Sequence, residues 1–238
     1  MYDIAFISYD EKNAGINFLK LISHATKNRV YRIHGIKGIH QAHIEAAKQS
    51  TTSMFYVVDA DASILPNFKF NINLDPSEED IVHVWRSRNP VNNLEYGYGG
   101  VKLLPTQLTL NMNLANPDMT TSISSRFKVM ADVSNITQFN VDPMSTWRSA
   151  FRECAKLASR VITDQYDKET QERLNAWRFN QSHASFAEYA RGGASAGEWF
   201  GKTYKADKKM LAKINDYNWL TSEYYGHIEQ YPPETFKK

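Results

Sequence analysis

Apolar residues in the first sixty positions follow two different spacings. Three runs are short, continuously apolar and rich in β-branched or aromatic side chains, which predicts buried strands at residues 3–8, 29–33 and 54–58. The segments between them carry apolar residues at helical spacing, which predicts helices at residues 13–25 and 39–49. The core-facing side of the first helix is expected to consist of Ile16, Leu19, Leu21 and Ile22. This alternation of strand and helix is typical of a parallel α/β sheet of the kind that binds nucleotides.

The middle of the chain continues the sheet and then changes to helix. Further strands are predicted at residues 81–85 and 101–104. Asp142 followed by Pro143 predicts a helix start, because Asp favours the N-cap and Pro the first helical position. That helix is expected to run to about residue 162 with Cys154 on its buried stripe.

Helical patterns dominate the C-terminal third, where Gly192, Gly193 and Gly197 are expected to interrupt them. We therefore predict two parts. Residues 1–163 form the α/β core that carries the nucleotide site, and residues 164–238 form a mostly helical extension that packs on the core and offers a surface for an acceptor.

Composition narrows the class of protein. The chain has 238 residues, 42% of them hydrophobic, which suffices for a sizeable core. The net charge of +2 indicates no general polyanion-binding character, so a nucleic-acid contact requires a local patch. A single cysteine excludes internal disulfides and favours a reducing, intracellular setting. We expect neither a signal peptide nor a membrane span.

Two carboxylates, Asp59 and Asp61, follow directly on the third predicted strand. In an extended segment residues two apart point the same way, and ligands of open α/β sheets bind at the carboxyl edge. Oxygen ligands of this kind suit Mg²⁺ or Mn²⁺, above all when the ion also carries phosphate oxygens. The alternative is that Asp59 is a turn residue and Asp61 caps the next element.

Two other loops contain residues that suit an anionic or sugar ligand. Gly38 and Lys37 precede the second helix, where a close backbone approach, a cation and a helix N-terminus favour a diphosphate. A glycine-rich stretch around residues 96–100 adds aromatic faces on which a sugar stacks, namely those of Tyr96 and Tyr98. An ordinary β–α turn and a glycine hairpin would explain the same residues.

Basic residues occur in two places. Arg86 and Arg88 follow the fourth predicted strand and suit phosphate or a DNA backbone, with surface ion pairing as the alternative. The extension interleaves lysines with aromatics, which suits a phosphate backbone with base stacking, although a solvated lysine-rich helix face explains the same residues and is the commoner case. These residues are Lys202, Lys205, Lys208, Lys209 and Lys213 with Trp199, Phe200, Tyr204, Tyr217 and Trp219.

Several longer blocks give the chain a resemblance to GT-A-type glycosyltransferases, in particular to a group of small glycosyltransferase-like proteins of T-even-like tailed phages. The resemblance covers about residues 1–180 and rests on residues 34–43, 57–61, 82–90, 94–105 and 118–123. It implies a GT-A-like, nucleotide-binding α/β/α sandwich with a Mn²⁺ or Mg²⁺ cofactor and a UDP-sugar donor. Some members are linked to transfer of a sugar, including arabinose, onto 5-hydroxymethylcytosine in phage double-stranded DNA. That activity protects the DNA from host nucleases in the cytoplasm of the infected cell.

The resemblance also implies roles for individual residues. Asp61 would ligate the metal, Asp59 would face the metal or the ribose, and Asp142 would be the catalytic base. The nucleotide-sugar would be contacted by Ser8, Tyr9, Asp10, Lys37, Gly38, Gly99, Gly100 and Arg148. The acidic pair usual at the base position is missing, since Val141 precedes Asp142. A different acceptor (protein, lipid or glycan) and a non-catalytic nucleotide- or DNA-binding module therefore stay open.

Overall fold

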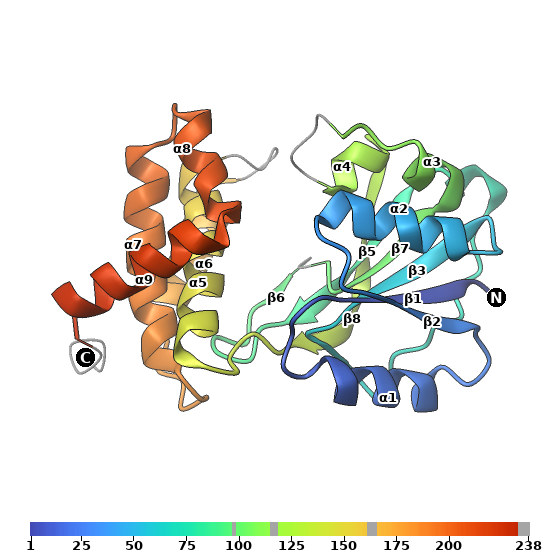
Figure 1. Ribbon diagram of the computed structural model, residues 1–238, viewed down its shortest axis with the longest axis horizontal. Helices are drawn as coiled ribbons and strands as arrows, with labels where there is room; N and C mark the ends of the chain where they lie inside the picture. The colour runs from blue at the N-terminus through green and yellow to red at the C-terminus, as the bar shows by residue number, and fades with distance from the viewer. Residues whose placement is uncertain (97–98, 115–118, 161–165, 233–238) are drawn as a thin grey trace. The chain divides into compact units, whose positions relative to one another are not determined.

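The computed structural model describes residues 1–96, 99–114, 119–160 and 166–232 (Figure 1). The chain divides into two compact units. The first comprises Met1–Asn89 and Glu95–Gln138, and the second comprises Pro90–Leu94 and Phe139–Lys238. The second unit therefore begins before the boundary expected at residue 163, because the helix that starts at Pro143 packs with the C-terminal helices.

The first unit is built on a sheet whose first three strands are parallel, as the apolar runs predict. These strands are β1 (Asp3–Ser8), β2 (Val30–His34) and β3 (Met54–Asp59), in the order β2-β1-β3. In this register Ile4 lies opposite both Val30 and Tyr56. The parallel arrangement brings the carboxyl ends of β1 and β3 to one edge of the sheet.

Beyond β3 the sheet becomes mixed, and its order continues β3-β7-β5-β8-β4. β7 (Val101–Pro105) is antiparallel to β3 and to β5 (Val82–Arg88), and β6 (Glu95–Tyr96) is a short partner of β5. β8 (Phe127–Thr137) is parallel to β5, and β4 (Ala62–Ile64) pairs antiparallel with its end. The sequence does not predict β8, because few of its residues are buried and it lacks an apolar run.

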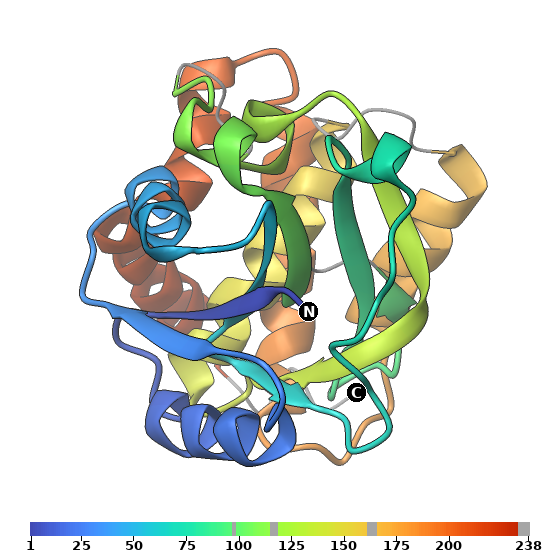
Figure 2. The same cartoon turned by 90° about the vertical axis from the view of Figure 1, so that its right-hand side faces the viewer.

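Helices cover both faces of the sheet (Figures 1 and 2). α1 (Ala14–His24) packs on one face over an aromatic cluster that includes Tyr56, Phe70 and Trp85. α2 (Ile39–Gln49) lies on the other face with α3 (Thr106–Leu110) and α4 (Met119–Ile123), and a 3₁₀ turn (Pro76–Glu78) precedes β5. The predicted α/β class with helices on both faces of the sheet is confirmed.

The expected core-facing side of α1 is wrong in part. Ile16 is 54% exposed and Leu19 is 66% exposed, and Ile22 is exposed as well. The buried positions of α1 are Ala14, Asn17 and Leu21. A hydrogen bond from Asn17 to the carbonyl of Ala60 accompanies this orientation, so a polar side chain lies where periodicity placed an apolar one.

The second unit is helical, as expected. Its elements are α5 (Pro143–Ser159), α6 (Asp167–Arg178), α7 (Ala187–Thr203), α8 (Lys208–Ala212), a 3₁₀ turn (Lys213–Asn215) and α9 (Tyr217–Gln230). Asp142 caps α5 with Pro143 at its start, and Cys154 is buried in its core, both as predicted. None of the described helices has the length and hydropathy that crossing a membrane requires.

The glycines of α7 do not interrupt the helix, contrary to expectation. They form a stripe four residues apart that faces α5. An added Cβ would lie 2.2 Å from the Trp147 carbonyl oxygen at Gly193 and 2.2 Å from that of Phe151 at Gly197. At Gly201 it would lie 2.4 Å from the carbonyl oxygen of Ala155. Such small-residue stripes let two helix backbones approach closely, so here glycine maintains packing and does not end a helix.

Candidate functional site

The candidate site lies at the carboxyl edge of β1 and β3. β3 ends at Asp59, and a two-residue turn through Ala60 and Asp61 leads directly into β4. Asp59 is paired with Ile7 of β1, and its backbone N–H donates to the Gly100 carbonyl at 2.9 Å. The structure therefore brings together the end of β1, the Asp-Ala-Asp turn and the glycines that precede β7, all within the first unit.

Asp59 forms a salt bridge with Lys102 of β7. Lys102 lies opposite Val57, and its ammonium donates to both carboxylate oxygens of Asp59, at 2.9 and 3.0 Å. Lys102 is only 5% exposed, and buried lysines are rare unless they are paired. Burial raises the pKa of the Asp59 carboxyl, and the neighbouring Lys102 opposes that rise. The pair compensates the charge on Asp59 inside the protein.

Among the residues that the structure describes, no Lys or Arg forms a salt bridge with Asp61. The pKa of its carboxyl is raised to about 7, chiefly by burial and then by the nearby carboxylates of Asp59 and Glu11, with a smaller opposing effect from Lys102. A half-buried carboxylate in an acidic surrounding gains most from a positive ligand. Asp61 is thus the group in the turn that is best suited to bind a cation.

The side chains at this edge suit a cation that is also bound by the phosphates of a ligand better than a cation that is bound by protein ligands alone. No group of three or more His, Cys, Asp or Glu side chains that could hold a metal occurs among the residues the structure describes. Both oxygens of Asp59 already accept from Lys102, whereas no described Lys or Arg forms a salt bridge with Asp61. Mg²⁺ usually keeps several waters and takes one or two carboxylates plus substrate phosphates, and these residues fit that mode of binding.

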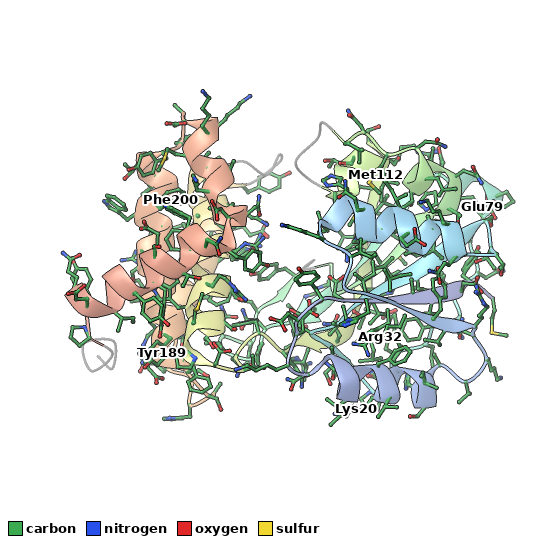
Figure 3. All side chains as sticks on the ribbon, in the orientation of Figure 1. Lys20, Arg32, Glu79, Met112, Tyr189 and Phe200 are labelled. Atoms are coloured by element: carbon green, nitrogen blue, oxygen red, sulfur yellow. The ribbon has the colours of Figure 1, made fainter. Side chains whose placement is uncertain are left out.

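The end of β1 places three predicted contacts at the same edge. Ser8 is buried, and its hydroxyl accepts a hydrogen bond from Arg32 Nε at 2.9 Å and lies 3.0 Å from His34 Nδ1. Arg32 itself lies against the rings of Phe6 and Phe18, on the side of the sheet that α1 covers (Figure 3). Tyr9 and Asp10 follow and are exposed, so they are accessible to a ligand while Ser8 is held by its neighbours.

The turn after β2 adjoins this edge. The Gly35 N–H donates to the Ser8 carbonyl at 3.0 Å, and both Gly35 (φ 74°) and Gly38 (φ 99°) have positive φ, which favours glycine. Gly38 is the N-cap residue of α2 and supplies no side-chain cap. Lys37 is exposed beside it. The structure places Lys37 and Gly38 where the sequence predicts them, and a diphosphate contact there stays a prediction.

Gly99 and Gly100 are fitted closely around the salt bridge. Gly99 has a φ of 73°, and a Cβ there would lie 3.1 Å from Lys102 Cε. A Cβ on Gly100 would lie 2.8 Å from the side-chain nitrogen of Asn135, whose oxygen accepts from Ser87 and Ser134. Both positions therefore require glycine. Because glycine has no side chain, the backbone at Gly99 and Gly100 is not covered by side chains of these two residues.

The predicted phosphate contacts Arg86 and Arg88 are engaged within the protein. Arg88 forms a salt bridge with Glu95 at 2.8 Å, and Arg86 donates to the Glu95 carbonyl at 3.0 Å and lies 3.7 Å from its carboxylate. This arrangement matches the alternative of surface ion pairing. Tyr96 is half-buried in β6, whereas Tyr98 lies outside the described residues.

Asp142 and Arg148 belong to the second unit. One carboxylate oxygen of Asp142 accepts from the Ser145 N–H at 2.7 Å and the other from the Ser145 hydroxyl at 3.0 Å. The guanidinium of Arg148 lies 4.5 Å from the centre of the Tyr217 ring. Capping accounts for both oxygens of Asp142, and its role as a base stays a prediction.

The second unit also carries a basic surface segment, residues 199–219, with five lysines and two aspartates. Lys202 and Lys213 are paired with Glu198 and Asp216. The other three lysines, Lys205, Lys208 and Lys209, are exposed and have no salt-bridge partner among the described residues. Two aromatic residues of the segment, Trp199 and Tyr217, are exposed as well.

Sequence reasoning missed three residues of the site. Lys102 carried a signal, because a lysine inside an otherwise apolar strand is unusual. Asn17 carried a weaker one as a polar residue within an apolar helical pattern. Gln138 carried none, since it follows a strand that the sequence does not predict.

No protein-family model and no curated protein matches this sequence. Among solved structures, the chain is similar to a glycosyltransferase involved in the glycosylation of the major capsid of PBCV-1, with 15% identity over 54% of this chain and 82% of that chain and a TM-score of 0.34. It is also similar to HddC from Yersinia pseudotuberculosis, with 14% identity over 58% of this chain and 91% of that chain and a TM-score of 0.35. Both TM-scores lie below 0.5, so neither similarity bears on what this chain does.

Proposed function

We propose that this protein is a glycosyltransferase that uses a nucleoside diphosphate sugar, in particular a UDP-sugar, together with Mn²⁺ or Mg²⁺. The observation that carries the proposal is the uncompensated Asp61 carboxylate beside the Asp59–Lys102 pair at the carboxyl edge of the sheet. Open α/β sheets bind nucleotides at this edge. The resemblance of the sequence blocks to GT-A-type enzymes points to the same chemistry.

The residues of the site suit the departure of a diphosphate. Negative charge accumulates on the leaving group as the glycosidic bond breaks, and a divalent cation supplies the neutralising charge when bound. Asp61 would hold that cation together with phosphate oxygens. Asp59, fixed by Lys102, would face the ribose or the cation, and Lys37 would add a positive charge at the start of α2. The close-fitting backbone at Gly99 and Gly100 would border the sugar.

We propose 5-hydroxymethylcytosine in phage double-stranded DNA as the acceptor, on the resemblance of the sequence to phage enzymes. The exposed lysines of residues 199–219 support this choice, because phosphate contacts by lysine provide most of the sequence-independent affinity for DNA. The sugar would be a pentose such as arabinose, or glucose. The modification would protect the DNA from nucleases in the cytoplasm of the infected host.

Asp142 is the proposed base that accepts the proton of the attacking hydroxyl. A base of this type contributes on the order of 10²–10⁴-fold to the rate. Asp142→Ser separates this role from capping, because serine also caps helices well. A fall in kcat of that size with an unchanged melting temperature supports the base, and an unchanged kcat assigns Asp142 to the cap alone.

The transfer reaction tests the proposal directly. The protein is incubated with UDP-sugars, Mn²⁺ and duplex DNA that contains 5-hydroxymethylcytosine. The DNA is then digested, and the masses of the released nucleosides are measured by mass spectrometry. A mass gain of one sugar on hydroxymethylcytosine, absent with Asp61→Asn, is the expected result. If no nucleoside gains a sugar from any common pentose or hexose donor, DNA is ruled out as the acceptor. If the protein does not bind UDP, sugar transfer from a UDP-sugar is ruled out.

A further inference from the structure

Asn17 occupies a position in α1 where an apolar residue would be expected. It is 2% exposed and lies in the buried stripe with Ala14 and Leu21. Its side-chain nitrogen donates to the Ala60 carbonyl at 2.9 Å and to Gln138 Oε1 at 3.0 Å. Its side-chain oxygen is buried and has no hydrogen-bond partner among the described residues. A buried, unsatisfied acceptor destabilises the fold, so stability alone does not explain an asparagine here.

Gln138, the residue directly after β8, contacts both Asn17 and the turn that contains Asp61. Its backbone N–H donates to the Asp61 carbonyl at 2.7 Å, and its side-chain oxygen also accepts from Asn13 at 3.3 Å. Asn17 and Gln138 therefore join three segments that are distant in the sequence: the start of α1, the turn after β3 and the residue after β8.

The two carbonyls that these residues bind belong to the peptide groups on either side of Asp61. The Ala60 carbonyl belongs to the peptide group before the Asp61 Cα, and the Asp61 carbonyl belongs to the group after it. Because peptide groups are planar, fixing both of them fixes the two backbone dihedrals of Asp61. These dihedrals set the direction of the Cα–Cβ bond, from which the side-chain rotamer then places the carboxylate.

Asp59 is held independently of this network. Its carboxylate is fixed by Lys102, and its N–H by the Gly100 carbonyl. Loss of the Asn17 side chain would therefore free the Ala60 carbonyl, and loss of the Gln138 side chain would remove an oxygen that accepts from Asn17, while the Asp59–Lys102 pair stays in place.

We infer that Asn17 and Gln138 are positioning residues that orient the Asp61 carboxylate toward the cation and diphosphate of the donor. This inference rests on the proposed function. Neither residue touches the reacting atoms, and both act through the backbone of the turn. Residues that orient a metal ligand typically change metal affinity about 10- to 100-fold when they are lost.

The test compares Asn17→Ala with a matched control, Asn28→Ala. The Asn28 side-chain nitrogen also donates to two carbonyl oxygens of the first unit, those of Tyr2 and Phe70, at 2.9 and 3.2 Å. Both substitutions remove an amide nitrogen that donates to two oxygens, but Asn28 lies after α1, next to residues that are not part of the site. Binding of UDP is measured by calorimetry in the full-length protein with and without Mn²⁺, and the melting temperature of each variant is recorded.

We expect Asn17→Ala to weaken Mn²⁺-dependent UDP binding about tenfold or more and to leave metal-free UDP binding unchanged. Asn28→Ala should lower the melting temperature without changing either affinity. Gln138→Ala, which keeps the backbone bond to Asp61, should weaken Mn²⁺-dependent binding in the same direction and carries the test if Asn17→Ala does not fold.

The opposite outcome is equally clear. If Asn17→Ala and Gln138→Ala both have a lower melting temperature but bind UDP in the presence of Mn²⁺ as tightly as the unmodified protein does, then Asn17 and Gln138 have only a structural role and the inference is wrong. If the unmodified protein shows no Mn²⁺-dependent UDP binding at all, the proposed function is wrong, and the inference that rests on it is wrong as well. The unmodified protein therefore separates the two failures.

Discussion

The ammonium of Lys102 lies within hydrogen-bonding distance of both carboxylate oxygens of Asp59, at 2.9 and 3.0 Å, although the two residues are 43 positions apart in the sequence. The lysine side chain is 6% exposed and the aspartate side chain 36% exposed. One charge of the pair is therefore buried, and the other is open to ligand or solvent. The pair anchors Asp59, whereas Asp61 forms no salt bridge with any Lys or Arg in the described part of the chain.

Replacing Lys102 by methionine should destabilise the fold, because it leaves the Asp59 carboxylate without its compensating charge. We expect a loss of about 2–3 kcal/mol in the free energy of unfolding, less than is typical for a fully buried pair because Asp59 is partly exposed. Urea denaturation at pH 7 measures it. Lys102→Met combined with Asp59→Asn should recover part of the loss, and additive effects of the two changes would contradict a coupled pair.

Stability should fall as pH rises through the range in which Asp61 titrates. The folded-state pKa of about 7 lies above the ordinary value of 3.8. Between these values the folded state keeps a proton that the unfolded state releases, so a rise in pH favours unfolding. Asp61→Asn removes this titration. We expect the variant to gain about 1–2 kcal/mol relative to the unmodified protein between pH 4.5 and pH 8, a figure reduced for solvent screening.

The same ionisation should control cation binding. A carboxylate must lose its proton to bind a metal, so Mn²⁺-dependent UDP affinity should increase as pH rises through about 7. Calorimetry at pH 6 and pH 8 checks this, with Asp61→Asn as the variant that should not respond. Equal affinity at both pH values would rule out Asp61 as the ligand.

A single methyl group on the stripe of α7 should disrupt the second unit. Gly197→Ala places a Cβ 2.2 Å from the Phe151 carbonyl oxygen, which forces α5 and α7 apart. We expect a loss of about 3 kcal/mol. Gly226→Ala in α9 is the control, because no atom lies within 4 Å of its added Cβ. That variant should gain about 0.5–1 kcal/mol, since alanine favours the helix. Similar melting temperatures for both variants would contradict close helix packing.

Removing three lysines from residues 199–219 should weaken DNA binding more than removing three elsewhere. The test variant carries Lys205→Gln, Lys208→Gln and Lys209→Gln. The control carries Lys20→Gln, Lys27→Gln and Lys69→Gln, which removes the same charge from exposed positions of the first unit. Fluorescence anisotropy with a hydroxymethylcytosine duplex measures affinity across salt concentrations. The slope of log affinity against log salt should decrease by roughly 2–3 in the test variant alone, and equal changes in both variants would exclude a specific surface.

Local features of the sequence determined much of the first unit. The apolar runs gave β1, β2 and β3, and helical spacing gave α2 with the bounds Ile39–Gln49. The cap at Asp142 and the strand-end position of Asp59 and Asp61 followed in the same way. Periodicity, capping and turn chemistry act between near neighbours in the chain, and for that reason they can be identified without a structure.

Tertiary structure decided which side chains meet. The pairing of Lys102 with Asp59 depends on β7 lying beside β3 in one particular register, and no local pattern specifies that register. The orientation of α1 buries the polar Asn17 and exposes the apolar Leu19, the reverse of what their hydropathy alone would suggest. In the sequence the glycines of α7 suggest a broken helix. In the structure they are needed because a Cβ at these positions would clash with carbonyl oxygens of α5. Each of these outcomes depends on contacts between segments far apart in the chain, and the energy of such contacts is absent from any short stretch of sequence.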